Sequence, residues 1–403
     1  MSNNSQSASK LRVAVVGGGI GGLAAAAFLT RAGLQCTLFE QAPALGEVGA
    51  GLVMAPNAMR LLRRMGVADR VVENAVRLKA GWEFRRWSDG TVLSVEDLDQ
   101  RCKELYGEDT YVMHRADLLA AIRSAVPDHV IRLGRRAASI EQDADGARIT
   151  LADGGVHEAD VVIGADGVHS AVRGIIASPA PAAYSGMCAF RALVPADKAP
   201  EFSRRAVQTL WIGPGRHLVH YPVSAGRFIN LVAFAPAGDY TKESWSATAD
   251  LEDFLAEFAG WDRRLEDLIK AAERPGRWAL LDREPLQRWT HGRVALLGDA
   301  AHPMYPFFAQ GAAQAIEDAA VLTHCLVRYA DTPVHALTTY EAARIERTTR
   351  IQSLSHERKD INHLPDGPEQ RERDARLADG DALAKSAWLY TYDPLQALEE
   401  VAS

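Results

Sequence analysis

The order of apolar and polar positions at the start of the chain predicts a strand, a helix and a second strand. Leu11 to Val16 is an apolar run of strand length, and the alanine-rich stretch from Leu23 to Ala32 has the composition of a helix. A second apolar run, Cys36 to Phe39, follows after a short break. Strand, helix and strand in this order form a βαβ unit, which indicates an α/β protein with a parallel sheet.

Further elements interrupt this unit before the chain returns to it. Asp89-Gly90 and Asp153-Gly154-Gly155 are turn sequences, and each centres a predicted hairpin. The second hairpin leads back to the first sheet. The predicted elements are the helices Asn57 to Met65 and Arg115 to Val126, the hairpin Trp82 to Val95, and the strands Arg148 to Leu151 and Val156 to Ile163.

The pattern changes between residues 184 and 278, where strand-like runs separated by glycine or proline turns predict an inserted β-rich domain. These runs are Val207 to Ile212, His217 to Val223 and Phe228 to Phe234. The buried-strand pattern of Val294 to Leu297 and the helical spacing within Gly311 to Tyr329 then predict a return to the first domain.

The last part of the chain is predicted to leave that domain. After a helix from Ala336 to His356, residues 358–381 are charged and punctuated by proline and glycine, which is typical of a mobile linker. The aromatic tail from Trp388 to Tyr392 is expected to dock onto the body. The predicted parts are a disordered terminus (1–10), a discontinuous nucleotide-binding domain (11–183 and 279–357), a β-rich substrate domain (184–278), and a charged linker with the C-terminal tail (358–403).

Composition and charge exclude several classes of function. The net charge is −7 and the basic residues are scattered, so nucleic acid is not expected as a partner. No run reaches the ~18 to 20 apolar residues that cross a bilayer, and the first ten residues lack the apolar core of a secretory signal. The protein is therefore expected to be soluble. Four widely spaced cysteines without a CxxC pair predict reduced thiols in a cytoplasmic protein, with no disulfides and no metal site.

The segment between the first strand and helix has the spacing of a dinucleotide-binding turn. Gly17 permits the tight turn, Gly19 lets the backbone approach a pyrophosphate, and Gly22 lets the helix pack near the strand. Glu40 ends the second strand at the offset where an acid bonds a ribose hydroxyl. The alternative is a glycine-rich turn of another α/β protein, and these residues leave open which dinucleotide binds.

Two later segments resemble the remaining fingerprints of flavoprotein hydroxylases. Residues 160–173, with Asp166-Gly167 at the turn, resemble the DG fingerprint, and Gly298-Asp299 followed by Gly311-Ala312 resembles the GD fingerprint. With residues 46–51 and 114–118, they make the chain similar over nearly its full length to FAD-dependent aromatic hydroxylases of the para-hydroxybenzoate hydroxylase fold. Among these, it resembles salicylate, 3-hydroxybenzoate and 6-hydroxynicotinate monooxygenases.

The resemblance implies a Rossmann-like FAD-binding domain with an inserted β-rich substrate domain and a C-terminal helical segment. Arg115 would offer donors to oxygen-rich parts of FAD, and Asp299 would bond a ribityl oxygen. The implied FAD contacts are Gly17, Gly19, Gly22, Glu40, Gln41, Arg115, Leu133, Asp166, Asp299, Gly311 and Ala312. Alternative roles are a surface ion pair for Arg115, a helix cap for Asp299 and a turn brace for Asp166.

A reducing nicotinamide would lack a dinucleotide domain of its own, because no second GxGxxG precedes a helix. The resemblance implies that NADH or NADPH reduces the flavin transiently and leaves before O2 forms a C4a-hydroperoxide. The protein then positions a small phenolic or N-heteroaromatic substrate and excludes water. A monomer or a homodimer is expected.

The strand from Arg216 to Pro222 is the expected source of the groups that activate the substrate hydroxyl. Its alternation places His217 and Tyr221 on one face and His220 on the other. Related hydroxylases carry a histidine and a tyrosine four residues apart on this strand, so His217 and Tyr221 are the predicted catalytic residues. The alternative is a packed tyrosine and a structural histidine.

An apolar wall is expected opposite this strand, formed by Val53, Met304, Pro306 and Phe307. The 6-hydroxynicotinate enzymes carry a histidine at the position of Val53, which weakens that substrate assignment. Arg191 either supports the site or forms a structural ion pair. Other functions on this scaffold are hydroxylation of a quinolone or another secondary metabolite, flavin-dependent reduction or halogenation, and flavin binding without turnover. The WxWxIP segment of the halogenases is absent.

Overall fold

The predicted βαβ unit forms the centre of a six-stranded sheet. The structure is a computed structural model, and it describes residues 11–46, 51–177, 183–238 and 248–401. The strand order is β18-β19-β12-β1-β2-β8, and β1 pairs in parallel with both β2 and β12. The predicted disordered terminus, residues 1–10, lies outside the described residues. The elements are β1 (Arg12–Val16), α2 (Ile20–Arg31), β2 (Gln35–Phe39), β8 (Ile131–Arg132), β12 (Val161–Gly164), β18 (Thr290–His291) and β19 (Val294–Leu296).

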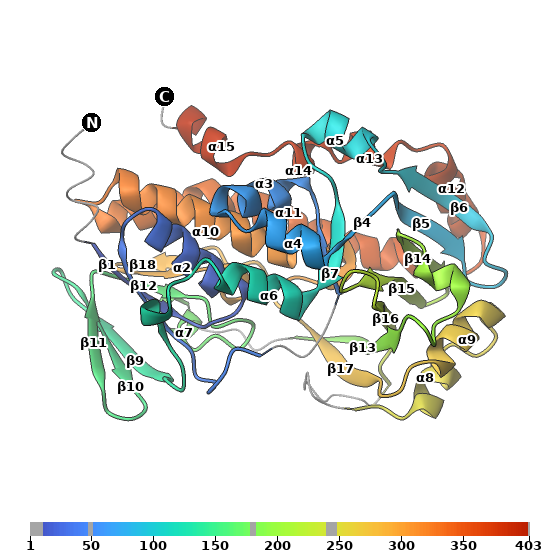
Figure 1. The fold of residues 1–403 in the computed structure, drawn as a ribbon, viewed down its shortest axis with the longest axis horizontal. Coiled ribbons are helices and arrows are strands. Elements are labelled where there is room, and N and C mark those ends of the chain that lie inside the picture. The colour runs from blue at the N-terminus through green and yellow to red at the C-terminus, as the bar shows by residue number, and fades with distance from the viewer. Residues whose placement is uncertain (1–10, 47–50, 178–182, 239–247, 402–403) are drawn as a thin grey trace.

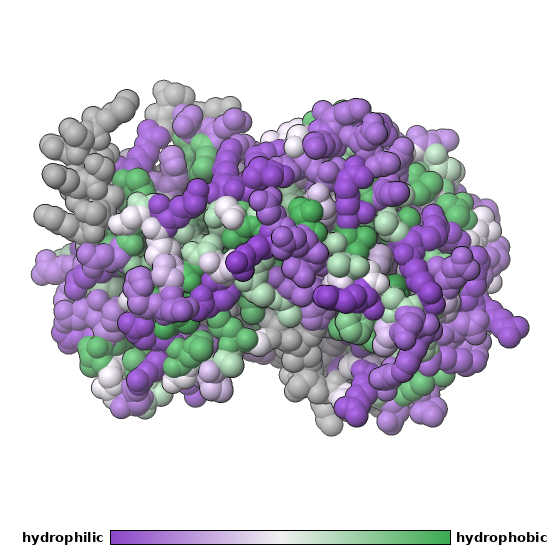
Figure 2. Space-filling view, in the orientation of Figure 1, coloured by the Kyte–Doolittle hydropathy of each residue, from purple (hydrophilic) through white to green (hydrophobic). Residues whose placement is uncertain are grey.

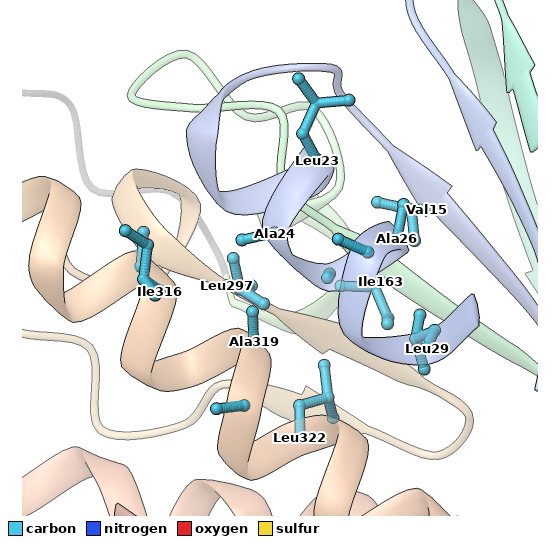
Figure 3. Packing of buried hydrophobic residues seen from close by; sticks show 14 of the residues in the cluster. Val15, Leu23, Ala24, Ala26, Leu29, Ile163, Leu297, Ile316, Ala319 and Leu322 are labelled. Atoms are coloured by element: carbon cyan, nitrogen blue, oxygen red, sulfur yellow. The ribbon is translucent and has the colours of Figure 1, made fainter. Parts of the chain in front are cut away.

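The core of this first domain lies between the sheet and two helices, α2 and α10 (Gly311–Arg328). Alanines on α2 let the two helices approach closely, and Leu23 and Leu29 of α2 belong to the same buried cluster as Ile316 and Leu322 of α10 (Figure 3). All four of these side chains are fully buried. Burial of one such side chain contributes about 1.5–3 kcal/mol, so this packing fixes α2 and α10 against the sheet.

A seven-stranded sheet forms the second domain, in the order β17-β13-β16-β15-β14-β5-β6. The sequence boundaries placed the hairpin β5–β6 in the first domain, and the structure corrects this assignment because β14 pairs in parallel with β5. The strands are β5 (Ala80–Arg86), β6 (Val92–Asp97), β13 (Ala183–Pro195), β14 (Val207–Gly213), β15 (Arg216–Val223), β16 (Phe228–Pro236) and β17 (Gly276–Asp282).

The two faces of the seven-stranded sheet have different partners. Helices α8 (Leu251–Glu257) and α9 (Arg263–Lys270) cover one face, where Leu218 packs with Phe254 and Leu265. The opposite face meets the segment 303–309 of the first domain, which includes η4 (Pro306–Phe308). The interface between the two domains therefore lies on the face that carries His217 and Tyr221.

Smaller elements connect the two sheets. One three-stranded sheet has the order β3-β7-β4, and a second three-stranded sheet has the order β11-β10-β9. The predicted hairpin at Asp153-Gly154 is confirmed, because β10 and β11 of the second sheet pair on either side of this turn. The remaining elements of this region are β3 (Gly51–Met54), α3 (Pro56–Met65), α4 (Ala68–Asn74), β4 (Val76–Arg77), α5 (Arg101–Tyr106), β7 (Tyr111–His114), α6 (Arg115–Arg123), η1 (Asp128–Val130), β9 (Ala137–Gln142), β10 (Ala147–Leu151), β11 (Val156–Ala159), α7 (Arg173–Ile176), η2 (Glu201–Arg204) and η3 (Gly298–Ala300).

The prediction of a mobile linker over residues 358–381 is wrong. The long helix α11 (Pro333–Asn362) continues into this stretch, and Pro368 starts a further helix, α12 (Pro368–Ala378). Charges that suggested a linker instead form contacts, such as the 2.9 Å ion pair from Arg86 to Asp374. Three short helices follow, α13 (Ala382–Lys385), α14 (Ala387–Tyr390) and α15 (Pro394–Val401). The first of them lies beside α5 and β6, and the last lies along the first domain near α10 (Figure 1).

The aromatic tail docks onto the body, as predicted, and its contacts include residues of α11. Arg347 covers the ring of Tyr392 at 3.8 Å, and Arg350 covers the ring of Trp388 at 3.9 Å. On the face shown in Figure 2, hydrophobic side chains occupy small areas among hydrophilic ones. Within the described ranges, no helix combines the length and apolar character needed to cross a membrane.

Candidate active site

Four segments of the predicted cofactor site meet at one edge of the six-stranded sheet. Gly17 follows β1, Glu40 follows β2, Asp166 follows β12 and Asp299 follows β19. These strands run in parallel as neighbours, so their carboxyl ends share one edge. Ligands of open α/β sheets bind at this edge.

The three glycines of the first turn have different surroundings. A Cβ on Gly17 would lie 2.3 Å from the carbonyl oxygen of Ala165, and a Cβ on Gly22 would lie 1.9 Å from that of Gly17. A Cβ on Gly19 would meet no atom within 4 Å. Gly17 and Gly22 are therefore required by packing, whereas Gly19 faces open space at the start of α2. No side chain caps this helix, so its first amides are available to an anion.

Glu40 fixes the end of β2 against the glycine turn. Its carboxylate accepts hydrogen bonds from the backbone N–H groups of Gly18 (2.6 Å) and Ala42 (2.7 Å). Gln41 is exposed next to it, and Leu133 is exposed beyond the end of the neighbouring strand β8. These three predicted contacts thus lie together at one end of the site.

The two later fingerprints are bonded to one another. Arg173 donates hydrogen bonds to the carbonyl oxygens of Asp299 and Ala300, each at 2.7 Å. Asp166 accepts hydrogen bonds from Ser170 and from the backbone of its own loop, which are the contacts of the turn brace considered above. Asp299 is exposed between buried neighbours, and its carboxylate is bonded to no residue that the structure describes.

Gly311 and Ala312 begin α10, which points its N-terminus toward this edge. The helix has neither a side-chain cap nor an acid in its first turn, and the preceding Ala309 has a φ of +52°. A left-handed alanine is strained, and such conformations occur where a binding loop needs a fixed shape. The first amides of α10 are consequently free to face a negatively charged group.

A buried ionic network holds α10 in place behind its N-terminus. Arg344 of α11 donates to Glu317 and to Asp318, each at 2.7 Å, and Glu317 also accepts from Asn57 at 2.8 Å. Burial raises the pKa of Asp318, but the charges of His302 and Arg344 outweigh it and bring the pKa down to about 2. Burial also raises the pKa of Glu317, but Arg347 and Arg344 outweigh it and lower the pKa, so both acids are ionised. The position of the helix therefore depends on these arginines.

Arg115 begins α6, directly after β7. His114 before it pairs with Gly51 at the start of β3, and its ring accepts the N–H of Ala116 at 3.2 Å. Residues 47–50 of the segment that precedes β3 lie outside the described residues. Arg115 is thus placed beside the predicted 46–51 segment, and its contact with FAD stays a prediction.

The predicted catalytic residues share one face of β15, as the alternation requires. The ring of His217 stacks on Phe234 at 4.6 Å and meets the edge of Phe307 at 5.1 Å. Tyr221 packs in the adjoining cluster with Val53. His220 points to the other side, where its ring meets Phe202. One histidine of this strand therefore faces the interdomain side.

The apolar wall forms in two adjoining clusters. Val53 and Met304 pack with Tyr221, whereas Phe307 packs with Phe234 beside His217. Pro306 is exposed, although the residues on either side of it are not. The structure thus brings Val53, Met304 and Phe307 to β15 and leaves Pro306 at the surface.

Two polar residues at this face were missed from the sequence. His363, next after the end of α11, has its Nε2 atom 2.6 Å from Nδ1 of His217. Asn230 of β16 is fully buried opposite Tyr221, and its side-chain oxygen accepts the N–H of Gly51 at 2.7 Å. An asparagine in the apolar run Phe228 to Phe234 was a readable signal, whereas nothing near His363 in the sequence points to His217.

A dinucleotide with a flavin ring fits these groups. Two uncapped helix N-termini, the open space at Gly19 and the exposed carboxylate of Asp299 all lie at the same sheet edge. A scan against protein families matches residues 10–355 to the FAD binding domain family. The chain belongs to this family. FAD is its cofactor, and NADH or NADPH is the co-substrate.

Curated relatives of this flavoprotein cover almost the whole chain. It is 41% identical over 382 residues to the 3-amino-4-hydroxybenzoate 2-monooxygenase PtmB3 of Streptomyces platensis. The matched region covers 95% of this chain and 96% of that protein. It is 37% identical to the 6-hydroxynicotinate 3-monooxygenase of Bordetella bronchiseptica, over 86% of this chain and 91% of that protein. The flavoprotein is therefore a monooxygenase.

Solved structures agree with the architecture. The flavoprotein matches HpxO of Klebsiella pneumoniae, complexed with FAD and uric acid, with a TM-score of 0.85 and 27% identity over 96% of this chain and 98% of that one. A salicylate hydroxylase in complex with its substrate matches with a TM-score of 0.81 and 26% identity, over 97% of this chain and 98% of that one. The α/β fold with two domains and a helical C-terminal segment is thus confirmed.

Proposed function

We propose that this flavoprotein hydroxylates a small phenol that carries a carboxylate group. The aromatic ring would lie between β15 and the wall of Val53, Met304 and Phe307, which suits a flat apolar body. Hydroxybenzoates and hydroxynicotinates, the compounds named in its relatives, belong to this chemical class. Because Val53 stands where the hydroxynicotinate enzymes carry a histidine, a hydroxybenzoate is the favoured substrate.

Unused hydrogen-bond donors around Tyr221 carry the proposal. The side-chain NH2 of Asn230 is buried and has no partner among the described residues, and the Tyr221 hydroxyl is bonded to none of them. Both residues approach Gly51, where a Cβ would lie 2.7 Å from the tyrosine oxygen. Leaving a buried donor without a partner costs about 1–3 kcal/mol, so a ligand oxygen is expected to complete these bonds.

A positive charge lies on the same face. Arg191 of β13 lies opposite Val232 of β16, and Val232 lies opposite Val219 of β15. Cross-strand neighbours share a face of the sheet, so Arg191 lies on the face of Val219, which is also that of His217 and Tyr221. Its guanidinium covers the ring of Trp278 at 4.2 Å. Burial raises the pKa of Tyr221 well above its usual range, and the charge of Arg191 opposes this shift. Two neutral donors and a nearby cation suit a carboxylate.

At the other end of the face, His217 would bond the substrate hydroxyl. Burial holds the pKa of His217 well below its usual range, so its ring is neutral at pH 7 and can accept a hydrogen bond from a phenol. FAD, when bound, supplies the redox chemistry that activates O2. The side chains of this face orient the ring, manage the hydroxyl proton and exclude water.

The substrate class is tested by paired compounds. We would load the protein with FAD and follow NADH and NADPH oxidation and O2 uptake with 3-hydroxybenzoate, salicylate, 3-amino-4-hydroxybenzoate and 6-hydroxynicotinate, each paired with the compound that lacks the carboxylate. Loss of one charge-assisted hydrogen bond of about 1.5–3 kcal/mol predicts kcat/KM lower by about 10- to 100-fold for the second compound of each pair. Equal stimulation by both compounds would contradict the proposed carboxylate site.

A substitution separates the carboxylate contact from general damage. Arg191→Gln should reduce the discrimination within each pair while leaving FAD binding unchanged. Arg227→Gln, on the connection between β15 and β16, is the matched control and should keep the discrimination. If Arg191→Gln keeps the wild-type ratio, Arg191 has no part in recognising the carboxylate.

We further propose that the enzyme acts in the cytoplasm as a monomer or a homodimer. Its four cysteines are free, and three of them are buried, which suits a reducing compartment. Light scattering of the purified FAD-loaded protein would give the assembly, and a mass above that of a dimer would contradict the second part of the proposal.

A further inference from the structure

A pair of histidines joins the substrate face to the C-terminal segment. Nδ1 of His217 and Nε2 of His363 are 2.6 Å apart, and their ring centroids are 4.9 Å apart. At this separation one nitrogen donates a hydrogen and the other accepts it, so the two rings hold complementary tautomers. The two residues are 146 positions apart in the chain, so only the folded protein creates the pair.

The pair leads from the interior toward the surface. His217 is 1% exposed between the rings of Phe234 and Phe307, whereas His363 is partly exposed at the end of α11. The backbone holds the outer ring in place, because Gly215 donates its N–H to the carbonyl oxygen of His363 at 3.0 Å. No residue in the described ranges bonds Nε2 of His217 or Nδ1 of His363.

Neither ring is suited to store a proton. Burial, together with the positive charges of Lys359 on α11 and Arg216 on β15, lowers the pKa of His363 to about 4. Arg216 also forms an ion pair with Glu257 at 2.9 Å. A proton taken up by His217 therefore needs an outlet, because an imidazolium in this apolar setting is strongly disfavoured.

We propose that His363 is the outer member of a two-histidine proton relay that removes the hydroxyl proton of the bound substrate. The proton of the substrate O–H passes to Nε2 of His217, the proton on Nδ1 of His217 passes to Nε2 of His363, and the proton on Nδ1 of His363 passes to water. The substrate becomes a phenolate, one water becomes hydronium, and both rings stay neutral in the opposite tautomer. The reverse transfers restore the tautomers when product takes up a proton.

This relay rests on the proposed function, since it requires a phenolic substrate next to His217. Its role is specific: it would determine how fast the bound phenol ionises, and not whether the aromatic ring binds. His217 touches the substrate in this scheme, whereas His363 acts through His217. A merely structural His363 would instead affect stability and affinity together.

The test uses FAD-loaded oxidised enzyme, without NADH, and 4-hydroxy-3-nitrobenzoate, whose phenolate absorbs visible light. A stopped-flow pH jump on the bound probe gives its ionisation rate, and a titration gives its Kd. His363→Gln keeps a hydrogen-bonding side chain but removes the transferable proton. Since general acid–base catalysis contributes about 10²–10⁴-fold, we expect ionisation at least about tenfold slower, with Kd within about twofold of wild type.

Two further measurements complete the test. His335→Gln, at the start of the same helix, is the matched control and should ionise the probe at the wild-type rate. Added imidazole should restore part of the rate in His363→Gln, because the outer position is partly exposed. His363→Asn serves as the second variant if the glutamine protein does not fold.

The outcomes distinguish the relay from the function on which it rests. Wild-type ionisation rates in the His363 variants, or slow ionisation that imidazole does not restore and that accompanies a matching loss of affinity, would overturn the relay. If wild-type enzyme oxidises NADH with no aromatic compound of the panel, the proposed function fails first. If the wild type turns over normally and only the relay result is negative, the function stands without it.

Discussion

Two glycines of the first turn allow packing and cofactor binding to be separated by experiment. In Gly22→Ala the new Cβ would lie 1.9 Å from the backbone oxygen of Gly17, so α2 must shift. Alanine gains about 1 kcal/mol of helix propensity, while overpacking costs about 1–3 kcal/mol and a backbone clash this close belongs at the upper end. We expect the unfolding free energy of the apoprotein to fall by about 1–2 kcal/mol.

Gly19→Ala should behave differently. Its Cβ would meet no atom within 4 Å, and the backbone, with φ −72° and ψ −174°, suits any residue. Reduced freedom of the unfolded chain stabilises by about 0.4–1 kcal/mol, and the poorer N-cap costs a similar amount, so apoprotein stability should stay unchanged. If the pyrophosphate occupies this space, the new Cβ displaces it and costs one hydrogen bond from a backbone N–H. Such a bond is worth about 1.5–3 kcal/mol, so the Kd for FAD should rise by about 10- to 100-fold.

Urea unfolding of the apoprotein measures its unfolding free energy, and titration of FAD fluorescence measures the Kd for FAD. Gly174→Ala is the control, because that position also meets no atom within 4 Å and has no positive φ. It should leave FAD affinity unchanged. Wild-type FAD affinity in Gly19→Ala would refute the assignment of the turn, and wild-type stability in Gly22→Ala would refute the packing argument.

Three further predictions address the rest of the molecule. Arg344→Met removes the buried cation that Glu317 and Asp318 share and leaves them only Arg347 and His302, so urea unfolding should show a loss of about 3 kcal/mol; an unchanged midpoint would contradict this. The pKa of Asp318, about 2 against an ordinary 3.8, contributes stability that is present above pH about 4 and lost as pH falls toward 2, so Asp318→Asn should flatten the stability curve there. Tyr221→Phe should slow aromatic-stimulated NADH oxidation at least about tenfold without changing the Kd for FAD, and weaker FAD binding would count against its role.

The cofactor half of the molecule could be predicted because its signals are local in the sequence. Gly17 and Gly22 are required by contacts within or next to one βαβ unit, and Asp299 directly follows a buried strand. Each fingerprint therefore carries its own structural context. The FAD-binding fold followed from three such segments, and the comparison with known families confirmed it.

The predictions that failed depend on contacts between distant segments. The hairpin β5–β6 joins the second sheet through β14, more than 100 residues later, and no feature of the hairpin itself encodes that pairing. The charges of residues 358–381 resemble those of a linker, because composition does not show that Asp374 meets Arg86. Helix α12 is stabilised by such tertiary contacts, which a local pattern does not contain.

The same contrast explains how the two halves of the site divide the chemistry. FAD would be held largely by backbone amides, glycines and helix ends, and these depend on the fold more than on individual side chains. The proposed substrate face would instead be assembled from side chains of five separate segments, contributed by Val53, Tyr221, Asn230, Phe307 and His363. Any one of them can change without disturbing the cofactor turn. Substrate preference is therefore free to vary on this scaffold while the flavin chemistry stays the same.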